Sequence, residues 1–229
     1  MDIIERASPN FDPRPTSVGI DMVVIHYTGM ASADAAFSRL GDPASRVSAH
    51  YAIDEDGAVY RLVPEGERAW HAGAAFWRGA RDINARSIGI ELVNPGHEYG
   101  YRPFAEAQMA ALETLASGIL ERHGIAPRNV VGHADVAPTR KKDPGELFDW
   151  ARLARVGIGL WPEAPVRNVG PADALVAMLA EYGYETEDPI RAIEAFQRHF
   201  RPRRVDGRAD RETSERLAGL LALCRCRSA

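Results

Sequence analysis

Hydrophobic residues in the first 160 positions form two kinds of pattern, short continuous runs and helically spaced positions. The run Met22–Tyr27 is apolar and β-branched, which predicts a buried strand. Two apolar segments between residues 50 and 63 flank Glu55–Gly57, a pattern typical of a β-hairpin. Apolar positions from 104 to 120 keep helical spacing, and Gly124 follows as a stop signal. Strands that alternate with helices predict an α/β fold, with a mixed central sheet flanked by helices.

Shorter stretches add further elements to this half of the chain. We expect an irregular proline-rich arm over residues 8–19, a helix capped by Ser32 that runs through Leu40, a strand over 129–132 and a helix over 146–155.

The C-terminal part has a different pattern. Residues 161–165 (Trp-Pro-Glu-Ala-Pro) break the composition and predict a linker. Three helical segments follow, over 171–182, 189–199 and 211–223, with Phe196 and Leu217 as expected core residues. We therefore predict two domains, residues 1–162 and a small three-helix domain over residues 163–229.

Composition and charge narrow the function classes. The hydrophobic fraction is 45% and the net charge is -4, so nothing favours binding to nucleic acid. No stretch approaches the ~20 apolar residues of a membrane span. The N-terminus lacks the pattern of a signal peptide, so we expect a cytoplasmic protein as the sequence stands, or a periplasmic or outer-membrane-associated one if a leader was removed. The two cysteines, Cys224 and Cys226, are expected on a C-terminal tail.

The strand at residues 87–93 carries an acidic residue among apolar ones. Ile88, Ile90 and Leu92 face one side, whereas Ser87, Gly89 and Glu91 face the other. A carboxylate there costs free energy unless it is paired or opens on a cleft. The alternative is an edge-strand glutamate in water.

Two histidines and one aspartate form a candidate metal set. His26 ends the first buried strand, His133 follows the strand at 129–132, and Asp143 lies in a proline-containing loop. Two imidazoles and one carboxylate can hold zinc and leave its fourth position open for water. Composition alone favours the simpler alternative of two hydrogen-bonded histidines and a turn aspartate. The aromatic loop over residues 64–86 is likewise either functional or a satellite core cluster.

Several short motifs, taken together and in order, resemble a known family. The chain is similar to type 2 N-acetylmuramoyl-L-alanine amidases, zinc enzymes that share their fold with peptidoglycan-recognition proteins. The motifs span roughly residues 6 to 160 and are Ser8–Pro15, His26–Thr28, Arg46–Tyr51, Trp70–Gly73, Ser87–Glu91, Gly132–His133 and Lys141–Gly145.

The resemblance implies a role for each matched position. It assigns one zinc ion per chain to His26, His133 and Asp143, and the catalytic roles to Glu91 and Lys141. It implies substrate-binding roles for a further set, namely Tyr27, His50, Trp70, His71 and Asn84.

The resemblance also implies the reaction and the partners. We expect hydrolysis of the amide bond between N-acetylmuramic acid, or its 1,6-anhydro form, and L-alanine of the stem peptide. Peptidoglycan or muropeptide fragments are the expected partners, and a monomer is the expected state. The alternatives are a non-catalytic peptidoglycan receptor and a different metal-dependent peptidase on the same scaffold.

The C-terminal helices resemble a small peptidoglycan-binding domain. Five arginines crowd one connection there, namely Arg198, Arg201, Arg203, Arg204 and Arg208. They are either a solvated surface or a site for stem-peptide carboxylates. Under the second interpretation, truncation near Glu163 is expected to leave turnover of small muropeptides nearly unchanged.

Overall fold

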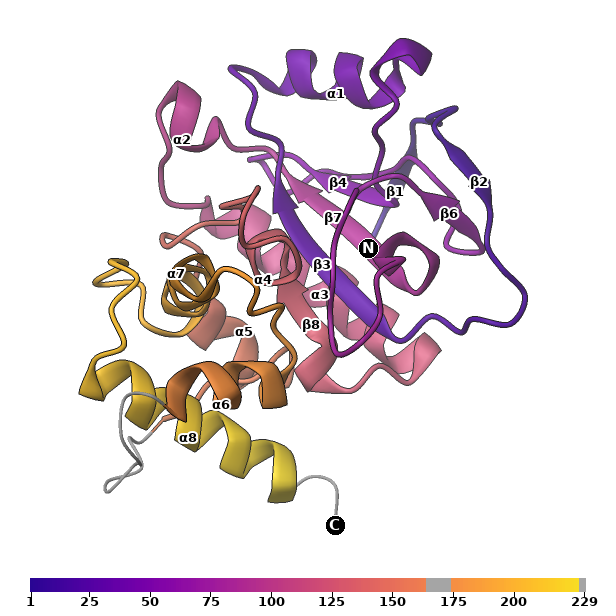
Figure 1. Cartoon of the computed structure of the whole chain (residues 1–229). Coiled ribbons are helices and arrows are strands. Elements are labelled where there is room, and N and C mark those ends of the chain that lie inside the picture. Colours follow the sequence, from indigo (N-terminus) through magenta and orange to yellow (C-terminus); the bar gives the residue numbers. More distant parts are fainter. Residues whose placement is uncertain (164–173, 227–229) are drawn as a thin grey trace.

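The computed structural model describes residues 1–163 and 174–226. Within these residues a six-stranded mixed sheet has the order β1-β5-β4-β7-β3-β8 (Figure 1). Its strands are β1 (Ile3–Glu5), β3 (Met22–Tyr27), β4 (Tyr51–Ile53), β5 (Val59–Arg61), β7 (Ser87–Leu92) and β8 (Val130–Gly132). A second, two-stranded sheet pairs β2 (Phe11–Pro13) with β6 (Glu67–Ala69). The predicted mixed α/β fold is confirmed.

The helices alternate with these strands and then follow them. They are α1 (Ala33–Gly41), α2 (Gly96–Tyr99), α3 (Glu106–His123), α4 (His133–Val136), α5 (Trp150–Arg155), α6 (Leu175–Tyr182), α7 (Pro189–Phe200) and α8 (Arg211–Cys226). Short 3-10 turns cover Pro43–Ser45, Ile83–Ala85 and Pro127–Asn129.

Three parallel strands form the centre of the large sheet. β3 pairs in parallel with β7 on one side and with β8 on the other. Its first five residues are buried, which explains why its sequence is a continuous apolar run. Because the three strands run in the same direction, their carboxyl ends meet at one edge of the sheet.

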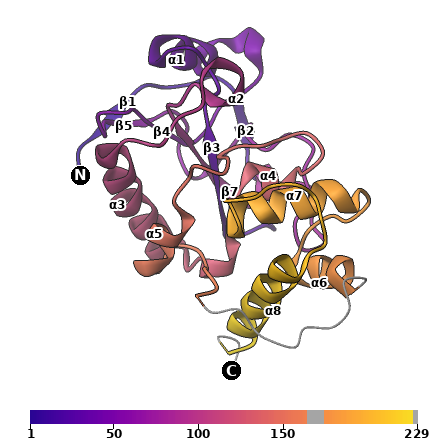
Figure 2. The ribbon, with the colours of Figure 1, turned by 90° about the vertical axis from the view of Figure 1, so that its left-hand side faces the viewer.

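Helix α3 covers one face of this sheet. Met109, Leu112 and Ile119 pack in one cluster with Ile25 and Ile90 of the central strands. The helix ends at Gly124, whose φ of 63° is a left-handed conformation that glycine adopts without strain. Figure 2 shows α3 and α5 on one side of the sheet and α7 on the other.

The C-terminal helices cover the opposite face. Phe196 of α7 and Leu217 of α8 are fully buried, as predicted, in the same cluster as Met22 and Val24 of β3. The predicted boundary at residues 162 and 163 stays a prediction, and the predicted helix start at Pro171 lies outside the described residues. Helices α6 to α8 nevertheless complete the core of the sheet that carries the candidate site.

Three local predictions are corrected. The arm over residues 8–19 contains β2, a strand whose partner lies more than fifty residues away and leaves no local signal. The helix predicted from residue 146 begins at Trp150, because the Asp149 carboxylate caps it by accepting the N–H of Arg152 at 2.9 Å. Cys224 is buried in α8 and does not lie on a tail.

The arginine cluster is largely paired within its own loop. Arg201 is 2% exposed, and its guanidinium lies 3.1 Å from Asp206 and 2.5 Å from Asp210. Arg204 also pairs with Asp206, at 2.8 Å. Arg201 is therefore neither a solvated surface charge nor an accessible carboxylate site, because it is buried and its two terminal nitrogens pair with aspartates of the same loop. In the part of the chain that the structure describes, no helix is long and apolar enough to cross a membrane.

Glu65 ties the long loop after β5 to the end of α3. Its carboxylate accepts hydrogen bonds from the Tyr51 hydroxyl at 2.8 Å, from Arg122 at 2.6 Å and from His123 at 2.5 Å. Partial burial raises the pKa of Glu65, but these hydrogen bonds outweigh it and lower the pKa from the usual 4.5 to about 2.

We predict that Glu65→Gln destabilises the fold in a pH-dependent way. A carboxyl group whose pKa is lower in the folded state stabilises that state fully above pH 4.5, and this contribution is lost as the pH falls toward 2. Denaturant unfolding should show a loss on the order of 1–3 kcal/mol at pH 7 that shrinks toward pH 2. Glu5→Gln, in an exposed ion pair with Arg61, is the control and should change little. A Glu65→Gln deficit that stays constant between pH 7 and pH 3 would contradict this assignment.

Candidate active site

The carboxyl edge of the three parallel strands carries the candidate site. His26 lies near the end of β3, directly opposite Glu91 on β7. His133 follows β8 as the first residue of α4. Asp143 comes from the loop after α4, and its main-chain carbonyl accepts the N–H of Ala134 at 2.8 Å. Sheet topology and one loop contact thus bring together residues that are far apart in the sequence.

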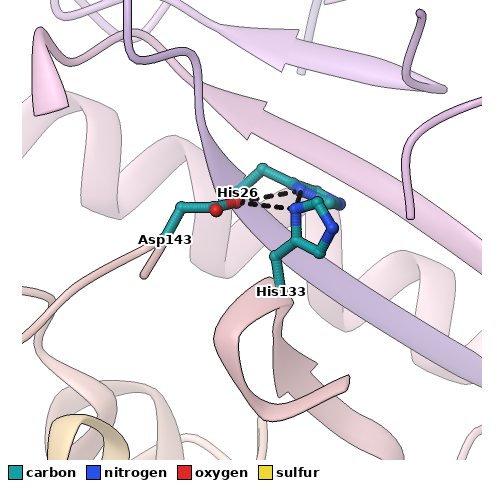
Figure 3. Close-up of side chains that lie close together, drawn as sticks. All are labelled: His26, His133 and Asp143. Carbon is teal, nitrogen blue, oxygen red and sulfur yellow. Dashed lines mark hydrogen bonds and ion pairs between the residues drawn. The ribbon is translucent and has the colours of Figure 1, made fainter. Parts of the chain in front are cut away.

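The three predicted zinc ligands converge on one point (Figure 3). Nδ1 of His26 lies 2.9 Å from Nδ1 of His133. Asp143 Oδ2 lies 3.1 Å from the first nitrogen and 3.0 Å from the second. All three side chains are buried, and among the described residues they form the one group of three or more potential metal ligands whose ligand atoms lie within 4.8 Å of one another.

A chain of hydrogen bonds assigns the proton positions on His26. The Ser87 hydroxyl donates to the Ile83 carbonyl at 2.6 Å, so its oxygen accepts from Nε2–H of His71 at 3.1 Å. Burial lowers the pKa of His71 well below its usual range, so this ring is neutral and its Nδ1 is an acceptor. Nε2–H of His26 then donates to that nitrogen at 3.1 Å. The lone pair of His26 Nδ1 is left facing Asp143.

His133 is oriented in the same way by a main-chain group. Its Nε2 lies 3.0 Å from the carbonyl oxygen of Ala72, which can only accept. Nε2 therefore carries a proton, and in the neutral ring Nδ1 presents a lone pair to the same point as that of His26. The Ala72 segment is in turn held by Asn84, whose side-chain oxygen accepts the N–H groups of Ala72 and His71.

With both imidazoles neutral, this arrangement places three electron-rich atoms within 3.1 Å of one another with no proton between them. Burial, and then the positive charge that His133 carries when protonated, lower the pKa of His26 to about 4, so His26 is neutral near neutral pH. A divalent cation would relieve the repulsion among the three atoms. Two imidazole nitrogens and one carboxylate oxygen are a donor set that suits zinc and leaves a coordination position open.

Glu91 lies opposite His26 and is not one of the three converging side chains. Burial, followed by the Asp143 carboxylate, raises the pKa of Glu91 to about 8, and Lys141 partly opposes the shift. Its Oε2 is buried without a hydrogen-bond partner among the described residues. A carboxyl group with a pKa near neutrality and a free oxygen is suited to moving a proton.

A cavity of about 610 Å³ opens over these groups. On one side it runs along α1, past Arg39, Leu40 and Trp70, and on the other it reaches α2 at His97 and Tyr99. Arg140, Lys141 and Lys142 also line it. A cavity of this size admits a ligand of several linked groups.

The predicted substrate-binding residues divide into two groups. Tyr27, Trp70 and His71 line the cavity. His50 and Asn84 do not line it, and their substrate-binding role stays a prediction. His50 is fully buried and its Nδ1 accepts the N–H of Gly89 at 2.9 Å, so it supports β7. Asn84 supports the loop that carries His71.

Sequence reasoning missed two supporting residues. Ser87 was placed on the correct face of its strand, but its contact with His71 depends on a loop that only the fold positions. Arg14 donates to the carbonyls of Asn84, Ala85 and Ser87 and so holds the same loop from the N-terminal arm. The sequence signal for Arg14 was its position between Pro13 and Pro15. The two prolines restrict the backbone there, which helps to hold the planar guanidinium in one orientation.

Comparisons with known proteins agree with this geometry. A family model described as N-acetylmuramoyl-L-alanine amidase matches residues 15–146. The N-acetylmuramoyl-L-alanine amidase AmiD of Escherichia coli is 40% identical, over 96% of this chain and 90% of AmiD. The 1,6-anhydro-N-acetylmuramyl-L-alanine amidase AmpD of Haemophilus influenzae is 36% identical over 63% of this chain and 86% of AmpD.

Solved structures extend the likeness to the whole fold. The complex of Escherichia coli AmiD with anhydro-N-acetylmuramic acid-L-Ala-D-γ-Glu-L-Lys has a TM-score of 0.81 and covers 95% of this chain and 93% of that one. AmpDh3 of Pseudomonas aeruginosa with an anhydromuramic pentapeptide is 31% identical, has a TM-score of 0.80, and covers 93% of this chain and 94% of its own. From the fold, the site and these matches, the chain belongs to the type 2 N-acetylmuramoyl-L-alanine amidase family.

Proposed function

We propose that this amidase uses one zinc ion, held by Nδ1 of His26, Nδ1 of His133 and the carboxylate of Asp143. It hydrolyses the amide bond between N-acetylmuramic acid, in its 1,6-anhydro form as well, and L-alanine of the stem peptide. The observation that carries the zinc proposal is the convergence of two imidazole nitrogens and one carboxylate oxygen within 3.1 Å, beside the cavity that His133 and Asp143 line.

The residues around this point divide the chemistry among them. Zinc at such a site acidifies water and polarises a carbonyl oxygen. Glu91 takes the proton from the attacking water and passes it to the leaving amine of L-alanine. Lys141 lines the cavity and supplies positive charge where the amide oxygen becomes negative. The products are a free lactyl carboxylate on the sugar and a peptide that begins with L-alanine.

The cavity lining supports a muropeptide as the substrate. Trp70 and Tyr27 offer aromatic surface at its two sides, and Arg39 and Lys142 offer cations to the carboxylates of a stem peptide. The AmiD and AmpDh3 structures with anhydromuramic peptides make fragments of this kind the first ligands to test.

The function is tested by mass spectrometry of the products from two substrates, a soluble 1,6-anhydro-muramyl tripeptide and purified sacculi. We expect release of the intact peptide, loss of this activity after chelation, and its recovery when zinc is added. The tripeptide without the sugar separates an amidase from a peptidase on the same scaffold. Cleavage of the sugar-free peptide, or full activity in the metal-free protein, would refute the proposal.

We predict that Glu91→Gln keeps zinc but loses most of its activity. The amide cannot accept the water proton, so kcat should fall by ~10²–10⁴. Zinc content measured by atomic absorption should stay at one per chain. A variant that loses the metal as well would make Glu91 a ligand.

The two neighbouring lysines should differ in their effect. Lys141 is half-buried and acts on the Glu91 carboxyl, whereas Lys142 is exposed. We predict that Lys141→Ala lowers kcat by about 10²-fold through lost oxyanion stabilisation, and that Lys142→Ala has a mild effect. Steady-state kinetics on the soluble substrate measure both, and equal losses would undo the assignment to Lys141.

Ser87→Ala should weaken zinc binding without touching a ligand. The substitution removes the hydroxyl that orients His71, and His71 in turn fixes the proton of His26 on Nε2. Supporting contacts of this kind contribute about 10–100-fold in metal affinity. Competition with a chelator measures the affinity. Ser8→Ala is a matched control, since the Ser8 hydroxyl is also buried and also donates to a main-chain carbonyl at 2.6 Å, that of Leu40. Equal zinc affinities in the two variants would exclude the orienting role.

A further inference from the structure

A buried carboxylate lies two residues after the ligand His133. Asp135 is 1% exposed and sits in the short helix α4. Its Oδ2 accepts the main-chain N–H of Gly132 at 2.7 Å, which joins α4 to the end of β8. This contact closes the strand-to-helix turn on which His133 stands.

Two further donors reach the same carboxylate from the C-terminal helices. The Tyr184 hydroxyl, just after α6, donates to Oδ1 at 2.6 Å. Nδ1 of His199, in α7, lies 2.7 Å from Oδ2 and donates to it. Burial and the Asp135 carboxylate raise the pKa of Tyr184 well above its usual range, so the hydroxyl keeps the proton that it donates.

Aromatic packing holds both donors in place. The His199 ring stacks on Trp150 at 3.8 Å between centroids and lies against Phe200. Its Nε2 is buried with no hydrogen-bond partner among the described residues, so Asp135 is the polar contact that fixes this ring. Tyr184 packs edge-on against Trp77 at 5.1 Å.

The carboxylate is costly to bury without these partners. An ionised group removed from water destabilises the fold unless hydrogen bonds replace its hydration. Loss of Tyr184 or His199 would leave one oxygen under-bonded and would favour movement of α4 toward water. Such movement reaches the site directly, because Ala134, between Asp135 and His133, donates its N–H to the Asp143 carbonyl at 2.8 Å.

We propose that Tyr184 and His199 are positioning residues for the metal site, which act through Asp135 on the geometry of His133 and Asp143. The proposal rests on the zinc function proposed above. It gives the C-terminal helices a part in the chemistry of the site in addition to any part in holding the cell wall. It also argues against the expectation that these helices can be removed near Glu163 without effect on small substrates.

The first test removes one hydroxyl from the full-length chain. We expect Tyr184→Phe to weaken zinc binding about 10-fold, measured by chelator competition. The visible absorption of the cobalt-substituted protein should shift, because the ligand geometry changes. Tyr182→Phe is the matched control, since Tyr182 is buried in the same cluster but its hydroxyl makes no hydrogen bond to Asp135. This control should keep wild-type affinity and the wild-type spectrum.

The second test asks whether the donor itself matters at position 199. His199→Leu removes the N–H, whereas His199→Asn keeps an N–H near the position of Nδ1. We expect the leucine variant to lose zinc affinity and kcat, and the asparagine variant to recover most of both. Thermal unfolding followed by circular dichroism shows whether each variant is folded, and Tyr184→Phe decides the matter if the leucine variant is not.

The outcomes separate this inference from the proposed function. A wild-type protein that binds no zinc refutes the zinc proposal itself. A wild-type protein that binds zinc, with Tyr184→Phe equal to Tyr182→Phe in affinity and spectrum, overturns the positioning role alone. Equal losses in the two tyrosine variants overturn it as well, because they would reflect a looser core and not the Asp135 contact.

Discussion

The candidate site depends on the convergence of two imidazole nitrogens and one carboxylate oxygen at the end of one sheet. Nδ1 of His26, Nδ1 of His133 and Oδ2 of Asp143 lie within 3.1 Å of one another, and with both rings neutral no proton separates them. Such an arrangement is unfavourable in isolation and persists because the surrounding fold determines it. Strand pairing fixes His26, the β8–α4 turn fixes His133, and a main-chain contact to Ala134 fixes the Asp143 loop. In the proposed zinc site, a cation would offset this cost.

Two neighbouring parts of the chain, which pack in one cluster on the same face of the sheet, support this arrangement. In the 64–86 loop, Nδ1 of His71 accepts the Nε2–H of His26, and the Ala72 carbonyl accepts the Nε2–H of His133. On the side of the C-terminal helices, Tyr184 and His199 hold the carboxylate that closes the β8–α4 turn. Hydrogen bonds thus join the sheet that carries the candidate site to the C-terminal helices. This explains why residues that lie far apart in the sequence pack in a single core.

Sequence reasoning predicted what depends on local pattern and missed what depends on distant partners. The apolar run of β3, the alternation of β7 and the Gly124 stop follow from periodicity and chirality, and each element is found where predicted. The convergence of His26, His133 and Asp143 came from a family resemblance, because spacing alone does not say which loop folds back on which strand. The supporting contacts of His50 were not predicted for a related reason. A histidine beside a motif and a histidine buried under a strand look the same in sequence.

Strand β7 shows how the alternation of side chains between the two faces of a strand builds the site. Three residues on one of its faces serve the same site in different ways. Ser87 orients His71 through its hydroxyl. Gly89 leaves room for the ring of His71, since a Cβ there would lie 2.5 Å from it. Glu91 is the first position on this face at which a side chain can reach the cavity. A larger residue at 89 would displace His71. His26 would then lose the acceptor for its Nε2–H, the contact that leaves the lone pair on Nδ1 for a metal. The small residues of this strand face are therefore as necessary to the site as its acid.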